Sequence, residues 1–175
     1  LVLACFYGLW VIAFHVPSTV MNAIGSIGAW NAPAESAFVT SGALALLAAH
    51  ASSRSTLALA ARLLAGASAV VFGFAHFNYI DFTASMVPAW IPAKTFWAWA
   101  TGAGHLLTGL ALLSGIRARL AATCEAAMMG SFVVLLHLPR VIASPDQHVE
   151  WIMLAMSSAL TGAALLVRKY ATIEA

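Results

Sequence analysis

The chain has 175 residues, of which 62% are hydrophobic and only 8% charged, and its mean hydropathy is +0.92. A soluble domain carries roughly 25% charged residues, so this chain lacks the polar surface that would cover an apolar core in water. Its net charge of +2 is too small and too scattered for a protein that binds nucleic acid. The composition therefore predicts an integral membrane protein whose surroundings are the lipid bilayer.

Six apolar windows follow one another along the chain, at about the length that spans a bilayer. Residues 77–93, between the third and fourth windows, are aromatic and proline-rich, and we expect them at the membrane interface or dipping into the bundle. His137-Leu-Pro139 should end the fifth helix, because the residue before a proline avoids helical conformation. The predicted fold is an all-α polytopic bundle of about six transmembrane helices, at residues 1–14, 33–49, 55–75, 94–114, 118–138 and 148–167.

The basic residues predict the orientation of the helices. If six helices alternate in direction, six of the eight Lys and Arg residues lie on one face of the membrane: Arg54, Arg62, Arg117, Arg119, Arg168 and Lys169. The positive-inside rule makes that face cytoplasmic, so we expect a bacterial inner membrane protein with a cytoplasmic C-terminus. The opposite, outer face carries the acidic connections, with Glu35, Asp81, Asp146 and Glu150.

A weak internal repeat relates the first two predicted helices to the last two. Gly8-x-x-Val11-x-x-x-His15-Val-Pro17 aligns with Gly130-x-x-Val133-x-x-x-His137-Leu-Pro139. We interpret residues 1–50 as the last two helices of a degenerate first repeat and residues 55–170 as a complete four-helix unit. Two further helices would then precede Leu1, and an axis along the membrane normal would relate the two repeats.

His105 and Glu125 are the leading candidates for catalytic residues. Ionisable groups inside a bilayer are costly, so each is a functional candidate. His105 lies nine or ten residues before the turn between the fourth and fifth helices, and Glu125 lies about nine residues after it. Antiparallel packing places both within about one helical turn of the same depth. The pair could hold a proton or bind a polar headgroup, or it could simply join two helices.

A second group of polar residues lies where the third and fifth helices reach the outer interface. His76, Asn78, Tyr79 and Asp81 combine aromatic surface with hydrogen-bonding groups, which suits a quinone-like ring and also suits an ordinary membrane boundary. His137 is expected at a similar depth. Arg140 follows it against the positive-inside trend, so it should pair with Asp146, Glu150 or Asp81, or meet an anionic substrate.

Three histidines at similar depth, His15, His76 and His137, raise the alternative of a metal or haem site. The sequence has no His-x-x-x-His spacing and no C-x-x-C pair. A histidine just before a helix end more often caps the last carbonyls. We therefore predict no metal site and disfavour haem.

Four motifs in the second half carry a family resemblance. They are Gly73-Phe-Ala-His76-Phe, Met86-Val-Pro-Ala-Trp-Ile-Pro92, Trp97-x-x-x-Thr101-Gly-x-x-His105-x-x-x-Gly109-x-x-Leu112-Leu113 and Arg119-Leu-Ala-Ala. On these motifs residues 72–170 resemble the DoxX-like membrane proteins. The resemblance implies a four-helix bundle and membrane redox chemistry, as in the subunits of thiosulfate:quinone oxidoreductase. The family commonly has Glu where this chain has His105, so Glu125 takes over the acidic role or the activity differs.

Two functional hypotheses follow. In the first, the chain is a membrane subunit that serves a quinone-linked redox complex, with His76, His105 and Glu125 positioning a quinone or passing its protons. In the second, it is a noncatalytic structural or assembly subunit of a larger membrane complex. A third possibility, a small-solute carrier, fits the repeat but lacks broken helices with paired charges.

Overall fold

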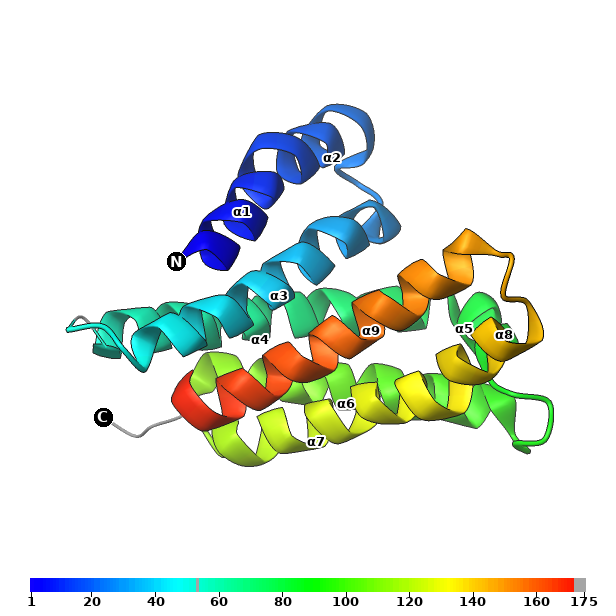
Figure 1. Cartoon of the computed structure of the whole chain (residues 1–175). Helices are drawn as coiled ribbons and strands as arrows, with labels where there is room; N and C mark the ends of the chain where they lie inside the picture. Colours follow the sequence, from blue (N-terminus) through cyan, green and yellow to red (C-terminus); the bar gives the residue numbers. More distant parts are fainter. Residues whose placement is uncertain (53, 172–175) are drawn as a thin grey trace.

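The computed structural model describes residues 1–52 and 54–171, and all the regular elements of that part are helices (Figure 1). Two of these helices, α5 (Ile80–Met86) and α8 (Leu138–Ala143), are short and lie together at one end of the bundle. The other α-helices are α1 (Val2–Trp10), α2 (Val16–Ala23), α3 (Asn31–Ala48), α4 (Arg54–Asn78), α6 (Lys94–Ser114), α7 (Ala118–Phe132) and α9 (His148–Leu166). A 3-10 helix, η2 (Ile27–Trp30), precedes α3, and three π-helices, η1 (Val11–His15), η3 (Val133–His137) and η4 (Val167–Ala171), follow α1, α7 and α9.

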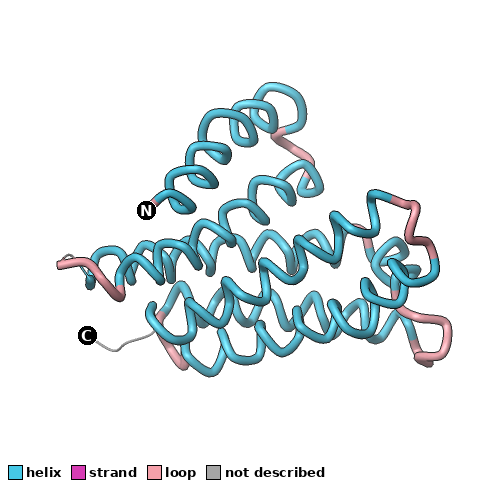
Figure 2. The backbone as a smooth tube through the Cα atoms, viewed as in Figure 1, coloured by secondary structure: helices cyan, strands magenta, loops and turns pink. Residues whose placement is uncertain are grey.

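Five helices form a closed ring. Going round it, α4 packs against α6, α6 against α7, α7 against α9, α9 against α3, and α3 back against α4. Their axes run side by side, and the connections between them lie at the two ends of the bundle, as the tube in Figure 2 shows. Helix α1 lies outside the ring against α3. Helix α3 is therefore one of the five helices that surround the interior of the ring.

Four segments of the described chain are long and apolar enough to cross a membrane: Val2–Asn22, Ser55–Asn78, Ala118–Ala143 and His148–Tyr170. The prediction of a membrane helix bundle is therefore confirmed, whereas four segments of the described chain, and not six, meet this criterion of length and hydropathy. Helices α3 and α6 fall short because their inward faces carry small and polar residues. These residues are Asn31, Glu35, Ser36, Thr40 and Ser41 on α3 and Gly102, His105 and Thr108 on α6.

The prediction that His137-Leu-Pro139 ends a helix is wrong. Pro139 has no backbone N–H, which would break an α-helix. Here the helix widens instead into a π-turn, η3 (Val133–His137), in which the Leu138 N–H bonds to the Val133 carbonyl. It then continues as α8 to Ala143.

The first helix shows the same device before its own proline. The π-turn η1 (Val11–His15) precedes Pro17, and the Val16 N–H bonds to the Val11 carbonyl. The helix then continues as α2 to Ala23, beyond the predicted end at residue 14. π-turns are rare outside such insertions, so their occurrence at matching places in α1–α2 and α7–α8 is informative.

The helix pairs that contain these π-turns also share side-chain contacts. Gly8 faces Thr40 as Gly130 faces Thr161, with a Cβ built on either glycine 3.6 Å from the threonine Cγ2. The remaining equivalent contacts are hydrogen bonds: Thr40 to the Ser36 carbonyl and Thr161 to the Ser157 carbonyl, and Trp30 Nε1 to the Ile24 carbonyl and Trp151 Nε1 to the Pro145 carbonyl.

Helices α4 and α6 approach each other through glycines. A Cβ added to Gly109 would lie 2.8 Å from the Gly66 carbonyl oxygen and 2.8 Å from the Val70 nitrogen. Both are backbone atoms that cannot rotate away. In membranes such small residues are what allow two helix backbones to pack closely.

We expect Gly109→Ala to lower the free energy of unfolding by about 1–3 kcal/mol, the usual cost of overpacking. The matched control is Gly162→Ala, because nothing lies within 4 Å of a Cβ built there. Denaturant titration of the detergent-solubilised protein, followed by circular dichroism, measures both variants. Equal stabilities would contradict a close α4–α6 seam.

Candidate functional site

The ring encloses a cavity of about 940 Å³ toward the end where α5 and α8 lie. Its polar groups are few and come from every helix of the ring. A cavity of this kind suits an apolar ligand whose orientation depends on a small number of hydrogen bonds. The apolar part of the wall includes Phe72, Phe82, Trp90, Trp97, Met128 and Phe132.

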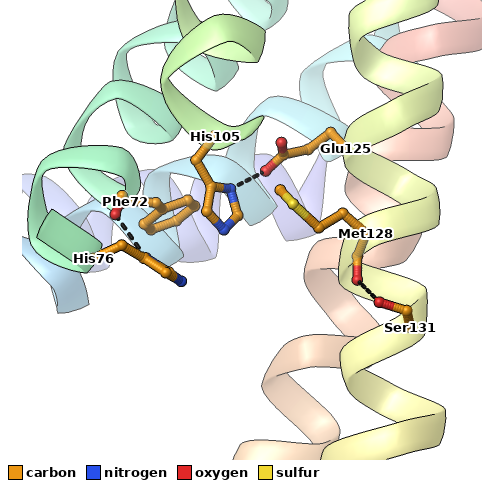
Figure 3. A network of polar contacts seen from close by, with 6 residues as sticks. All are labelled: Phe72, His76, His105, Glu125, Met128 and Ser131. Atoms are coloured by element: carbon orange, nitrogen blue, oxygen red, sulfur yellow. Dashed lines mark hydrogen bonds and ion pairs between the residues drawn. The ribbon is translucent and has the colours of Figure 1, made fainter. Parts of the chain in front are cut away.

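His105 and Glu125 form a buried dyad beside this cavity (Figure 3). Nδ1 of His105 lies 2.7 Å from Oε1 of Glu125, and the two residues are 1% and 0% exposed. Oε2 of Glu125 has no hydrogen-bond partner among the described residues. His105 lines the cavity whereas Glu125 lies behind it. The imidazole therefore stands between the cavity and the buried carboxyl group.

His76 is the second imidazole of the cavity wall. Its Nδ1 lies 2.8 Å from the Phe72 carbonyl oxygen, which can only accept, so Nδ1 carries the hydrogen and donates it. The ring centroids of His76 and His105 are 4.8 Å apart. In Figure 3 the second nitrogen of each ring points away from its Nδ1 partner, into the space beside α7. Both rings are thus held through Nδ1 and leave Nε2 for a ligand.

His137 reaches the cavity because of the π-turn that precedes it. In an uninterrupted α-helix it would lie about 80° around the axis from Met129 and about 120° from Glu125. The extra residue in the π-turn removes one step of about 100°, so His137 faces within about 20° of both Met129 and Glu125. His137 is 4% exposed, and its Nδ1 has no partner among the described residues.

Arg140 closes this region at the end where α5 and α8 lie, without lining the cavity. Its Nε and Nη2 each donate to a different oxygen of Glu150, and each of these two hydrogen bonds is 2.8 Å long. Its Nη1 lies 3.4 Å from the sulfur of Met86. Glu150 was one of the three partners expected for it. Met86 is part of the cavity wall. Arg140 therefore ties α8 and α9 to the end of α5.

The predicted outer group separates into two parts. Tyr79 lines the cavity beside His76, and its hydroxyl lies 3.4 Å from the Ser26 hydroxyl. Asn78 is exposed and donates to the Phe74 carbonyl of its own helix, and Asp81 is exposed on α5. Neither of these two residues lines the cavity.

Asn31 and Glu35 also line the cavity, and sequence reasoning missed them as site residues. They lie one turn apart on the same face of α3. Oδ1 of Asn31 is buried without a partner among the described residues. The signal was present, since Glu35 is a carboxylate within an apolar window. What the sequence did not reveal is that α3 closes the ring between α4 and α9.

The three histidines considered for a metal do not converge. His15 lies on η1, outside the ring, whereas His76 and His137 face the cavity. In residues 1–52 and 54–171 no group of three or more His, Cys, Asp or Glu side chains is arranged to hold a metal ion.

A ring of apolar helices around a buried histidine–carboxylate dyad defines a polytopic membrane helix bundle with an internal polar centre. Residues 57–138 match the family model of DoxX. The match confirms the resemblance predicted from the sequence: the chain is DoxX-like over this segment, which spans α4 to the start of α8. Helices α3 and α9, which complete the ring, lie outside it. Neither curated proteins nor solved structures provided a match to the chain.

Proposed function

We propose that the chain is a DoxX-like membrane subunit of a quinone-linked redox complex, that its cavity holds a quinone, and that His105 with Glu125 moves the protons of that quinone. The observation that carries this proposal is the placement of His105. Its Nδ1 is held by a buried carboxyl group while its ring lines an apolar cavity. That arrangement orients an imidazole as an acid or base toward a ligand.

The walls of the cavity support a quinone as the ligand. A quinone ring needs flat apolar surfaces on its faces and one hydrogen bond to each carbonyl oxygen. Phe72 and Phe132 supply aromatic surface next to His105, at ring-centroid distances of 5.6 Å and 6.3 Å. His76 and His105 supply two separate hydrogen-bonding nitrogens.

The opening of the cavity supports a ligand that arrives from the lipid. Four lining residues, Phe82, Trp90, Trp97 and Leu135, are also exposed on the surface of the protein. All four are apolar, and Trp90 lies in the loop before α6 whereas the other three lie in helical segments toward the outer end of the bundle. Aromatic residues of this kind are common at membrane interfaces. A lipid-soluble molecule can therefore reach the cavity without passing through water.

The chemistry requires an electron donor from outside the chain. Reduction of the quinone takes two electrons, which a redox partner subunit supplies, and two protons, which form an O–H bond at each carbonyl oxygen. When Glu125 is ionised it accepts the Nδ1–H hydrogen bond and stabilises the imidazolium, whose Nε2–H can be given to the quinone. Oxidation of the quinol runs the same steps in reverse.

The same proposal includes six membrane crossings. Helix α6, with 21 residues, spans about 31 Å, and α3 runs beside α4 within the ring. The basic residues then share the cytoplasmic face with the C-terminus, and the cavity opens to the outer face. We interpret residues 1–50 as a degenerate copy of the two helices at residues 118–170. The paired π-turns and matching contacts support this repeat.

Tryptophan fluorescence tests the ligand. Titrating the purified protein with a short-tailed quinone should quench emission, because Trp90 and Trp97 line the cavity and quinones accept excitation energy at contact distance. Trp97→Phe should remove a substantial part of the quenching, whereas Trp10→Phe, outside the ring on α1, should not. Unsaturable quenching, or equal loss in both variants, would contradict a quinone in this cavity.

The rival function is a noncatalytic structural subunit, in which the dyad only joins α6 to α7. Variants of the dyad distinguish the two functions, because a structural role is measured by stability and a chemical role by proton transfer.

A further inference from the structure

A carboxylate of α3, Glu35, faces the same cavity as the two imidazoles. It belongs to a helix outside the segment that matches the DoxX model. Its side chain is half-buried and has no hydrogen-bond or ion-pair partner among the described residues. An unpaired carboxylate on a helix enclosed by other membrane helices is costly, which calls for a functional explanation.

The depth of Glu35 in the bundle follows from ring contacts. Phe38 on α3 and Phe72 on α4 pack with ring centroids 5.9 Å apart. Glu35 lies three residues before Phe38 and His76 four residues after Phe72, and the two helices are antiparallel. At 1.5 Å per residue both lie outward of the phenylalanine pair, at depths that differ by about 1.5 Å. Glu35 and His76 are thus level with each other across the cavity.

The ionisable groups therefore descend in steps from the outer face. Tyr79 is outermost, Glu35 and His76 lie about one turn deeper, and His105 follows, with its ring centroid 4.8 Å from that of His76. Glu125 is the innermost, 2.7 Å from His105. His137, on η3, is the remaining titratable residue of the cavity wall.

Inward of Glu125 the character of the bundle changes. The described core there is built of small and apolar residues, and the next ionisable side chains that contact it are Arg62, Arg168 and Tyr170 at the basic end. Arg62 donates to the Leu112 carbonyl and Arg168 to the Thr123 hydroxyl. The apolar core residues are Ala61, Ala65, Leu112, Ala118, Ala122 and Val167. Protons of a ligand beside His105 therefore have a line of acids and bases on the outer side only.

We propose that Glu35 exchanges protons between the cavity and the water at the outer face, through His76 and His105, so that a quinone bound here takes up and releases its protons on that side. This inference rests on the proposed function. The role assigned to Glu35 is that of a proton donor and acceptor at the outer end of the line, and the ligand is held by the imidazoles and the apolar walls.

The test uses the full chain loaded with a short-tailed quinone and reduced by methyl viologen radical, a one-electron donor that carries no protons. A pH-sensitive dye records proton uptake. Glu35→Gln should slow the uptake roughly a hundredfold, the size of a general acid–base contribution. The quinone affinity, measured by tryptophan quenching, should stay unchanged. Glu35→Asp should recover much of the rate, and Asp81→Asn, an exposed outer carboxylate, should leave it unchanged.

Proteoliposomes give the side of the uptake. Trypsin added outside cleaves at the exposed Arg117 and Arg119 only when the basic end faces outward, which measures the orientation. Uptake should draw on the compartment that faces the acidic end.

The results of these experiments distinguish the role of Glu35 from the proposed quinone-binding function. An unchanged rate in Glu35→Gln, uptake from the basic side, or loss of quinone binding in both Glu35 variants would overturn the role of Glu35 while leaving the quinone site intact. Failure of the unmodified protein to bind quinone would overturn the proposed function and this inference together.

Discussion

Replacing Glu125 with Ala is expected to lower the free energy of unfolding by about 3–5 kcal/mol, the usual cost of removing one partner from a buried pair. His105 is 1% exposed and would lose the group that holds its Nδ1. The cavity left by the carboxyl group adds to the loss. Reversible denaturation in detergent micelles measures the effect.

A double variant separates chemistry from stability. Replacing a buried ion pair by apolar residues of similar volume is often neutral or stabilising, so His105→Leu with Glu125→Met should recover most of the stability lost in Glu125→Ala. Proton uptake on quinone reduction should nevertheless fall by about 10²–10⁴, because the acid–base group is gone. Asp146→Asn, an exposed carboxylate in a loop, serves as the control. Full proton uptake in the stable double variant would identify the dyad as a structural lock.

Filling the cavity should have the second-largest effect. Ser131 lies in the cavity wall on α7, and its hydroxyl donates a hydrogen bond to the Met128 carbonyl of its own helix. In Ser131→Phe the added ring occupies space that the ligand needs. Binding the quinone then overpacks the cavity, which we expect to weaken the binding free energy by about 1–3 kcal/mol. We expect quinone affinity to fall between about fivefold and a hundredfold or more. Titration by tryptophan quenching gives the dissociation constant.

Ser158→Phe is the matched control for this change. Ser158 is exposed on α9, and its hydroxyl also donates a hydrogen bond within its own helix, to the Leu154 carbonyl. Its added ring would face lipid, so the quinone affinity should stay within about twofold of the original. Equal affinities in the two variants would place the ligand outside this cavity.

Much of the architecture could be predicted from hydrophobic windows and punctuation. The windows at 94–114, 118–138 and 148–167 start where α6, α7 and α9 start, because Lys94, the turn at Gly115 and the polar segment before His148 interrupt the apolar pattern. The approach of His105 to Glu125 was also predictable, since a short turn between antiparallel helices fixes which residues share a depth.

The closure of the ring was not predictable in the same way. Nothing local shows that α3 packs against α9, because that contact joins elements far apart in the chain. The sequence therefore identifies Glu35 only as one of several carboxylates on the outer face. Asn78 and Asp81 are predicted as site residues instead, because they lie next to His76 in the chain. Proximity along a helix end is a weak guide to which side chains turn inward.

The π-turn Val133–His137 has a consequence for how this segment can vary. The direction in which His137 faces depends on how many residues lie between it and Glu125, more than on what those residues are. Exchanging one aliphatic side chain there for another preserves the geometry. Losing or gaining a single residue leaves the composition almost unchanged and still swings every later side chain about a quarter of a turn. The number of residues in this stretch of the helix, more than their identity, therefore determines whether His137 faces the cavity.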